Sequence, residues 1–573
     1  MRHGKASETE VEQPAMREQQ LQRVGLAAVL LLALALRAPG LTWALPDADR
    51  AFPYHPDEPT LVETGRHIAR TGDLNPHFFN YGSLTFYLAA ATFKAMELGG
   101  EPAPSAYYLA MRLWSVAFGL GTVALAFLLG RRWGGAAAGL VTAAVVAVTP
   151  VSQICSTYAT VDSLGTFLLT AALHSGLRVL EEHRPRDCIL AGLCAGLAAG
   201  VKYVGLLALL VPVTAVLLRT RGKVRREDGL WLGAAIATGV VAFLLTTPYA
   251  LLDTTSFWRD FSFEMQHKAE GGSTVPPGMS GLAFLLTQAM PCGLTWPVVV
   301  LGAMGLGVFV ARRTQADILL TAWLVLLLLV TGSGREVFVR YTMPLVPLMA
   351  LTIVGLLGKP GTATVFPPAP LAALVIGTRK RRLSLVSLLV VTGLLYSLLC
   401  AAAYAGVRAR PDVRDEAMAF IQAQAPSHRP SVGLREEPWF DDPPIGAVNG
   451  GPRTRGLFAR AAQQRGWRVT ISGWNAERLD ASVPKLFVAS EFDYRPEYLR
   501  GESRQASASF FAQLETRYDL IREFRSEPTL GPLHFPDAHI NDWRYVNPEI
   551  RVYVRRAAMA GAPAARRSAF QRR

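Results

Sequence analysis

Apolar stretches of about 20 residues recur along this chain from Leu21 to Tyr404. A helix of that length crosses the hydrocarbon core of a bilayer, which is about 30 Å thick. Hydrophobic residues make up 51% of the 573 residues, and charged residues only 18%. This composition excludes a disordered chain and predicts a polytopic α-helical membrane protein.

We expect about eleven transmembrane helices, given the length that one crossing needs. Their expected centres are near Leu31, Gly119, Val141, Thr166, Leu193, Leu210, Ala237, Val299, Leu326, Leu348 and Leu394. The polar residues 1–20 are expected to form a disordered cytoplasmic tail. A cleaved secretory signal is the alternative interpretation of the first apolar run, because Arg23 precedes that run and small residues follow it.

The net charge of +14 comes from basic residues that gather in short clusters between the apolar runs. Examples are Arg131 with Arg132 and the cluster at residues 379–382. Such clusters mark cytoplasmic loops, whereas a nucleic-acid surface needs a basic stripe with interleaved aromatic residues. We therefore expect membrane lipids and no nucleic acid as partners, in a multi-pass protein of the plasma or inner membrane. Its N-terminus would be cytoplasmic, and the proline-rich residues 360–377 an inside loop or a partly inserted segment.

The composition changes after Tyr404, which predicts a second domain. Asp412 is expected to cap an amphipathic helix, and helical patterns recur at 457–465 and 510–518. Short apolar runs predict strands at 431–434, 469–472, 486–490 and 551–554. The expected division is a transmembrane domain at 21–405 with its first outer loop at 46–106, an extracytoplasmic α/β domain at 406–557, and a flexible basic tail at 558–573.

Adjacent carboxylates, Asp57 and Glu58, follow the first apolar run. Such a pair can supply a general base at a membrane face, with the second carboxylate steering a partner or a metal. The alternative is the first turn of a solvated helix, where the helix dipole favours acidic residues. Nearby histidines at 55, 67 and 77 match no compact metal motif. We therefore expect no cofactor and assign no metal ligand, and a divalent metal ion stays an open alternative.

A third carboxylate, Asp162, stands at the boundary between two apolar runs. Such a carboxylate is costly unless it is paired or hydrated, so Asp162 is a functional candidate. Its alternative role is to cap the helix that follows.

Several short motifs together make the chain resemble the GT-C membrane glycosyltransferases that use polyprenyl-phosphate sugars. This group includes the dolichyl-phosphate-mannose protein mannosyltransferases, the RgtA/B/C/D-like enzymes and the aminoarabinose transferases. The resemblance covers about residues 21–357. It is carried by Asp57-Glu58 and by residues 72–84, 131–135, 157–162, 200–203 and 340–347.

The resemblance implies a glycosyltransferase of the hexosyl or pentosyl class, such as a mannosyltransferase, that acts in the cell envelope. Its donor would be a polyprenyl-phosphate sugar, and its acceptor a hydroxyl of a lipid, polysaccharide or protein at the outer face. In the family an aspartate of the first loop is the catalytic base, which assigns that role to Asp57, with Glu58 and Asp162 beside it. A single displacement implies inversion at the anomeric carbon.

The donor phosphate needs cations or hydrogen-bond donors at the outer face. The candidates for this role are Lys202, Tyr203, Arg335, Arg340 and Tyr341. Lipid-headgroup anchoring is the alternative role of Arg340. The expected substrate contacts are His55, Asn80, Tyr81 and His267. Aminoarabinose transferases carry a lysine followed by two prolines where residues 80–83 read Asn-Tyr-Gly-Ser, which weakens an aminoarabinose assignment.

Two other classes of membrane protein remain as alternatives. A secondary transporter would use Asp162, Lys202 and Arg112 to couple ions to a solute, and a noncatalytic receptor would bind a ligand with its outer domain. Transporters often show paired halves with charges deep inside their spans. This chain shows no half-repeat, and its charged candidates lie at the ends of the apolar runs.

Overall fold

The computed structural model describes residues 6–47, 50, 52–270, 274–357, 375–376, 383–424, 431–445 and 467–556. The expected helix at 457–465 and the tail at 558–573 lie outside these residues. So does the segment 360–377, apart from the short strand β1 (Val375–Ile376), which pairs with β2 (Leu383–Ser384).

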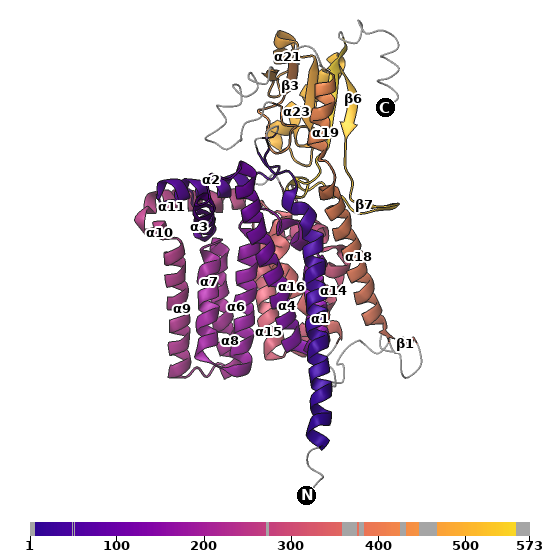
Figure 1. Cartoon of the computed structure of the whole chain (residues 1–573). Coiled ribbons are helices and arrows are strands. Elements are labelled where there is room, and N and C mark those ends of the chain that lie inside the picture. The colour runs from indigo at the N-terminus through magenta and orange to yellow at the C-terminus, as the bar shows by residue number, and fades with distance from the viewer. Residues whose placement is uncertain are drawn as a thin grey trace.

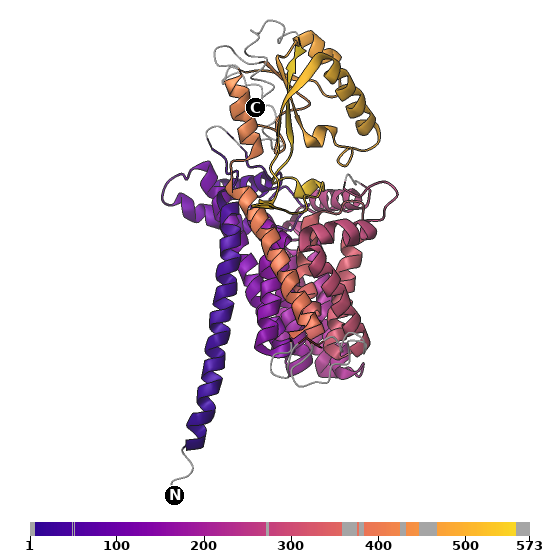
Figure 2. The ribbon, with the colours of Figure 1, turned by 90° about the vertical axis from the view of Figure 1, so that its right-hand side faces the viewer.

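A bundle of long helices carries a sheet domain at one end (Figures 1 and 2). The N-terminal end of α1 (Ala6–Thr42) lies at the opposite end from this domain. The helix begins at Ala6, so the disorder expected for residues 1–20 is wrong from residue 6 onward. This stretch is rich in Glu, Gln, Arg and Met, which favour helix and prolong the apolar helix that follows. Which end faces the cytoplasm stays a prediction.

Each expected span centre falls inside a helix of the bundle. Besides α1, these helices are α4 (Pro104–Val148), α6 (Asp162–Glu182), α7 (Pro185–Ala199), α8 (Leu210–Thr220), α9 (Arg226–Thr246), α14 (Trp296–Arg312), α15 (Gln315–Gly332), α16 (Val346–Leu357) and α18 (Leu385–Ala409). Within the described ranges, eight helices are long and apolar enough to cross a membrane, or nine if the bent pair at 281–294 and 296–312 is one span. The expected number of about eleven stays a prediction. The expected number is higher because α4, which holds two expected spans, is counted once among these helices, and because α7, with 15 residues, is too short to be counted.

Helix α4 consists of two limbs that meet at Gly134 and Gly135. Gly135 has φ 81°, a left-handed conformation that glycine adopts without a steric cost. A Cβ atom on Gly139 would lie 2.7 Å from the carbonyl oxygen of Phe127, so the two limbs pack against each other. This arrangement agrees with two expected spans, centred near residues 119 and 141, joined by a turn at 131–135.

Shorter helices cover the end of the bundle that faces the sheet domain (Figure 1). These are α2 (Glu58–Thr71), α3 (Leu84–Glu97), α5 (Pro150–Cys155), α10 (Tyr249–Leu252) and α11 (Thr254–Glu270). Two further kinds of segment complete the list. One is the bent segment made of α12 (Gly281–Phe284), η2 (Leu285–Ala289) and α13 (Met290–Leu294), and the other is the pair of 3-10 helices η1 (Tyr203–Leu209) and η3 (Val339–Leu345). The Asn80 amide donates to the Glu264 carboxylate, and the Arg335 N–H donates to the Lys268 carbonyl. The first loop, α11 and the segment before η3 therefore meet at one end of the bundle.

The sheet domain holds a five-stranded mixed sheet in the order β4-β3-β5-β9-β6. Its strands are β3 (Ser431–Leu434), β4 (Arg468–Ile471), β5 (Leu486–Ser490), β6 (Tyr518–Phe524) and β9 (Ile550–Arg555). Strand β3 is parallel to β4 and β5, whereas β9 is antiparallel to β5 and β6. Each of the four predicted strands is confirmed to within about one residue. Strand β6 was not predicted.

The remaining elements of this domain are helical or short. They are α19 (Val413–Ala423), α21 (Glu477–Ser482), α22 (Glu491–Tyr494), α23 (Gly501–Arg517), the hairpin β7 (Thr529–Leu530) and β8 (Leu533–His534), and η5 (Asn541–Trp543). Asp412 caps α19 as predicted, because its side chain accepts the Arg414 N–H. The helix predicted to reach residue 518 ends at Arg517, since Tyr518 pairs with β9. The domain boundaries stay predictions.

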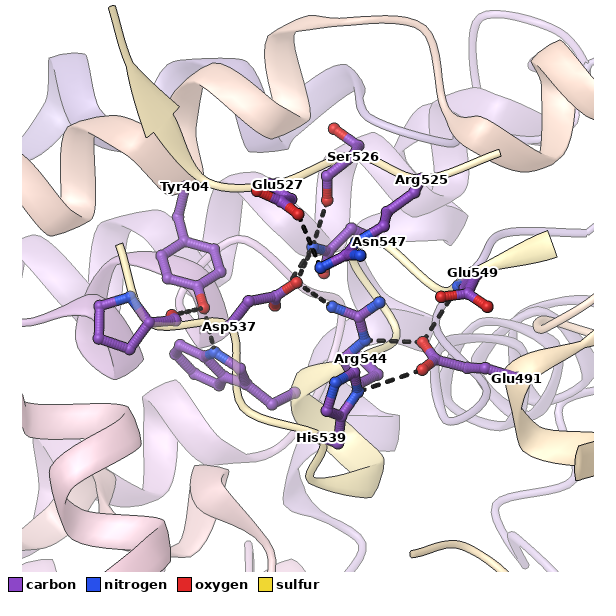
Figure 3. A network of polar contacts seen from close by, with 12 residues as sticks. Tyr404, Glu491, Arg525, Ser526, Glu527, Asp537, His539, Arg544, Asn547 and Glu549 are labelled. Atoms are coloured by element: carbon purple, nitrogen blue, oxygen red, sulfur yellow. Dashed lines mark hydrogen bonds and ion pairs between the residues drawn. The ribbon is translucent and has the colours of Figure 1, made fainter. Parts of the chain in front are cut away.

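Buried polar contacts fix this domain to the bundle. The Trp543 indole N–H donates to the Tyr404 hydroxyl of α18 at 2.7 Å. Within the sheet domain beside it, Arg544 donates to Glu491 at 2.6 Å and is paired with Asp537 (Figure 3). A buried polar group without a partner costs about 1–3 kcal/mol, so the Trp543–Tyr404 bond favours this seating of the domain on the bundle.

The close packing of α7 on α9 gives the first prediction. A Cβ atom on Gly196 would lie 2.0 Å from the Gly239 carbonyl oxygen, whereas one on Gly233 of α9 would meet nothing within 4 Å. We expect Gly196→Ala to lower the free energy of unfolding by about 1–3 kcal/mol, because the helices must separate. The measurement is thermal unfolding of the detergent-purified protein with Gly233→Ala as control. Equal midpoints for the two variants would contradict this packing.

Candidate active site

Asp57 stands immediately before α2 and pairs with an arginine far along the chain. Its Oδ2 lies 3.0 Å from Nη2 of Arg340, which belongs to η3. The Arg340 side chain is 9% exposed, and that of Asp57 is 31% exposed. The second guanidinium nitrogen of Arg340, Nη1, is buried and has no hydrogen-bond partner among the described residues. Asp57 thus keeps access to solvent beside a buried cation.

A second acid and cation meet next to this pair. The Lys202 ammonium donates to Oδ1 of Asp162 at 3.0 Å, and the Thr160 hydroxyl donates to Oδ2 at 3.2 Å. The same ammonium lies 4.5 Å from the centre of the Tyr341 ring, within the range of a cation–π contact. The N-cap of α6 is Val161, so the alternative role of Asp162 as the helix cap is wrong.

Both pairs border a cavity of about 980 Å³ that is partly open to the outside. Its charged lining is Asp162, Lys202, Glu264, Lys268 and Arg340, and its aromatic lining is Tyr81, Tyr203 and Tyr341. Apolar side chains of α6, η1, α15 and η3, such as Leu169 and Leu327, form the rest of the wall. A smaller hollow of about 290 Å³ next to it contains Asp57 and shares Tyr81, Val161 and Asp162 with the large cavity.

Glu58, the neighbour of Asp57, faces the protein interior. Both of its carboxylate oxygens accept from Arg112 at 2.7 Å, and Oε1 also accepts the Ala159 N–H at 2.7 Å. The side chains of Glu58 and Arg112 are fully buried. Burial alone would raise the pKa of Glu58, but the Arg112 guanidinium holds it below its ordinary value. This geometry favours a structural role over the catalytic role expected for Glu58.

His55 is buried directly behind Asp57. Its Nδ1 accepts the Asp57 N–H at 3.3 Å, and its ring centre lies 4.2 Å from that of Tyr158. Burial lowers the pKa of His55 to about 4, so the ring is neutral near pH 7. His55 therefore supports the backbone of Asp57, and it lines neither of the two hollows.

The other expected donor and substrate residues separate into two groups. Asn80, Tyr81, Tyr203 and Tyr341 line the large cavity together with Lys202 and Arg340. Tyr203 also donates its hydroxyl to the carbonyls of Phe79 and Tyr81, which holds the first loop in place. Arg335 and His267 lie outside the cavity lining. Arg335 bonds to the Lys268 and Val275 carbonyls, and His267 is exposed and stacks on Phe263.

Helix α11 contributes two cavity residues that we did not predict, Glu264 and Lys268. The signal for them is a four-residue spacing of Asp260, Glu264 and Lys268, which places all three on one face of the helix. Asp260 accepts the Phe79 N–H at 3.0 Å, and the Lys268 ammonium donates to the Val330 carbonyl at 2.7 Å. Burial lowers the pKa of Lys268, and the nearby charge of Lys202 lowers it further.

Metal ligands do not gather at this site. Across the described part of the chain, no group of three or more His, Cys, Asp or Glu side chains is placed to hold a metal ion. His77 instead lies 3.0 Å from Asp73 on the exposed side of the loop. The expectation that the protein needs no cofactor stays a prediction.

Comparison with known proteins gives matches in the membrane part of the chain. Residues 105–246 match the family model of the dolichyl-phosphate-mannose-protein mannosyltransferases. An undecaprenyl phosphate-alpha-4-amino-4-deoxy-L-arabinose arabinosyl transferase of Pectobacterium atrosepticum is 30% identical over 35% of this chain and 37% of its own length. The protein of the same name from Pseudomonas aeruginosa strain LESB58 is 27% identical over 56% of this chain and 58% of its own length.

A solved structure extends the likeness to most of the chain. The oligosaccharyltransferase of Archaeoglobus fulgidus in its apo form superimposes with a TM-score of 0.51 at 13% sequence identity, and the match covers 88% of this chain and 73% of that one. The chain has the GT-C fold. The same archaeal enzyme in complex with an inhibitory peptide and a dolichol-phosphate gives a TM-score of 0.50, with 88% of this chain and 80% of that one covered. The architecture shared with this archaeal enzyme confirms the expected fold class.

The buried Glu58–Arg112 pair gives the second prediction. Replacement by Glu58→Gln leaves the Arg112 charge buried and unpaired, so we expect a loss of about 3–5 kcal/mol in the free energy of unfolding. Glu101→Gln is the control, because Glu101 forms an ion pair with Arg70 while 71% of its side chain is exposed. We expect that variant to lose less than about 1 kcal/mol. Chemical unfolding in detergent measures both, and equal losses would exclude a supporting role for the buried pair.

The same pair gives a third prediction, on pH dependence. The folded protein lowers the pKa of Glu58, so the ionised pair stabilises the fold above the unfolded pKa, about 4.3, and this contribution is lost as the pH falls through the folded pKa. The difference in Tm between the parent protein and Glu58→Gln should therefore shrink on acidification from pH 7 towards pH 3. A difference that stays constant with pH would be the contrary result.

Proposed function

We propose that this chain is a membrane glycosyltransferase that moves a sugar from a polyprenyl-phosphate donor to an acceptor hydroxyl. One observation carries this proposal. A partly exposed carboxylate, Asp57, lies beside a large cavity that combines cations at one end with an apolar wall along the membrane helices. A lipid-linked phosphate has an anionic head that suits the cations and an apolar chain that suits the apolar wall.

The cations of the cavity suit the donor phosphate. Arg340 offers the unpartnered Nη1, and Lys202 and Lys268 add point charges on the same wall. The apolar wall extends along α6 from Asp162 to Leu169, a rise of about 10 Å, and suits the first isoprene units of the carrier. Asn80, Tyr81 and Tyr341 would contact the sugar or the phosphate.

Asp57 is the proposed general base. It would take the proton of the acceptor hydroxyl while that oxygen forms a bond to the anomeric carbon. The bond from this carbon to the phosphate oxygen breaks in the same step, and the carrier phosphate leaves as an anion beside Lys202 and Arg340. The leaving group is a stable anion and needs no general acid. A single displacement of this kind inverts the anomeric carbon.

The known relatives support a polyprenyl-phosphate donor. Two of them are named as undecaprenyl phosphate aminoarabinose transferases, and the archaeal enzyme was solved with a dolichol-phosphate. The residues at 80–83 lack the lysine of the aminoarabinose group, so we propose a hexose or pentose donor such as mannose. The acceptor would be a lipid, polysaccharide or protein at the outer face of the plasma or inner membrane.

The geometry does not favour a secondary transporter. Asp162 begins α6 and Lys202 immediately precedes η1, so both lie at helix ends, where they line the cavity together with Asn80 of the first loop. Arg112 is held by Glu58 and by the Trp43 carbonyl, so it is engaged in the support of the first loop. Coupling groups of transporters lie near the middle of the membrane.

A donor panel tests the function itself. Full-length protein in detergent is incubated with polyprenyl-phosphate sugars and candidate acceptors, and the release of carrier phosphate is measured. We expect release with at least one donor, dependent on an acceptor. No release with any donor, although the protein is folded, would contradict the proposal.

The base assignment gives the fourth prediction. We expect Asp57→Asn to lower kcat about 10² to 10⁴-fold, because general-base catalysis typically contributes that much. Asp73→Asn is the matched control, since Asp73 lies in the same loop, pairs with the exposed His77, accepts the Asn75 N–H and lines neither hollow. The control should retain most of the parent rate. An Asp57→Asn enzyme with the parent kcat would remove Asp57 from the mechanism.

A further inference from the structure

The sheet domain reaches the proposed site through one aspartate. Asp542 belongs to the short helix η5 and is 9% exposed. Its Oδ1 accepts the Val339 N–H at 2.9 Å, and its Oδ2 accepts the Arg340 N–H at 3.0 Å. Both N–H groups belong to the first turn of η3 in the bundle. One carboxylate therefore binds two adjacent backbone groups at the start of that helix.

These contacts replace a local helix cap. The first N–H groups of a helix have no partner within it and usually take a side chain from the residue just before the helix. That residue is Phe338, which has no hydrogen-bond acceptor in its side chain. The cap comes instead from Asp542, 203 positions after Val339. A negative charge at a helix N-terminus also interacts favourably with the helix dipole.

The segment around Asp542 contacts Arg340 directly and reaches Asp57 through His55. Arg340 has its backbone held by Asp542, and its guanidinium lies 3.0 Å from Asp57 and 4.3 Å from the centre of the Phe338 ring. Tyr545, three residues after Asp542, packs its ring edge-on against His55 with centres 5.4 Å apart. His55 in turn accepts the Asp57 N–H.

We propose that Asp542 is a positioning residue of the transferase site, through which the C-terminal domain sets the place of the Arg340 guanidinium. This inference rests on the function proposed above and gives the sheet domain a defined part in it. Asp542 acts through Arg340: by fixing the backbone at residues 339–340, it fixes where the cation meets the donor phosphate and Asp57.

The experiment compares three variants of the full-length protein in detergent. Asp542→Ala removes the cap, and Asp542→Asn keeps one acceptor oxygen. Trp543→Phe is the matched control, because it removes the neighbouring hydrogen bond of η5 to Tyr404 and leaves the start of η3 untouched. The first readout is hydrogen exchange of the peptide that covers residues 337–341. We expect faster exchange in Asp542→Ala, a smaller change in Asp542→Asn and the parent rate in Trp543→Phe.

The second readout is turnover. Misplaced catalytic groups and lost supporting contacts typically cost about 10 to 100-fold, so we expect Asp542→Ala to lower kcat/KM by this factor. Asp542→Asn should recover part of the loss, and Trp543→Phe should stay within about threefold of the parent enzyme. In an Arg340→Ala background, Asp542→Ala should change kcat/KM by less than about threefold, because the group that it positions is already missing.

The outcomes separate this inference from the proposed function. Two results would overturn the positioning role while the transferase activity stands. One is an unchanged hydrogen-exchange rate at residues 337–341, and the other is a double variant in which the kcat/KM losses of Asp542→Ala and Arg340→Ala multiply fully. A parent protein that releases no carrier phosphate from any donor would refute the proposed function and the catalytic role of Asp542 with it. Faster exchange together with non-additive losses supports the inference.

Discussion

Pairing of acids with cations at one edge of the helix bundle is the constraint on which the rest of the structure depends. A charge near the membrane is costly unless it is paired or hydrated. Asp57 with Arg340, and Asp162 with Lys202, meet this requirement in two adjoining hollows. Each pair joins segments that are distant in sequence, so the pairs also fix the first loop and η3 against the bundle.

The same pairs prepare the cavity for an anion. The cations are held in place before a donor arrives, which lowers the reorganisation needed when negative charge develops on a leaving phosphate. Arg340 contributes one nitrogen to Asp57 and keeps another without a partner. In the proposed mechanism Arg340 would contact both Asp57 and the donor phosphate, which would keep the proposed base next to the bond that breaks.

Support for Asp57 comes from three directions. The buried Glu58–Arg112 pair holds the start of α2 to the bundle, and α11 holds residues 79–80 through Asp260 and Glu264. The sheet domain adds a third support, because Asp542 caps η3 and Tyr545 packs on His55. These contacts explain how the first loop, whose backbone N–H and C=O groups need partners, can keep one geometry at a membrane surface.

The sequence by itself determined the helical bundle, most strands of the second domain and the place of Asp57, Asp162, Lys202 and Arg340 at one end of the apolar runs. These features follow from local hydrophobic patterns and from the rule that connections share a side of the membrane. Only the tertiary structure decided that Glu58 turns inward while Asp57 stays beside the cavity, and that Arg335 and His267 lie outside it. It also decided that Lys268 lines the cavity and that Asp542 bonds to the backbone of Arg340. These outcomes depend on contacts between residues far apart in the chain, such as Asp542 with Arg340, and the period of a helix or strand carries no record of such contacts.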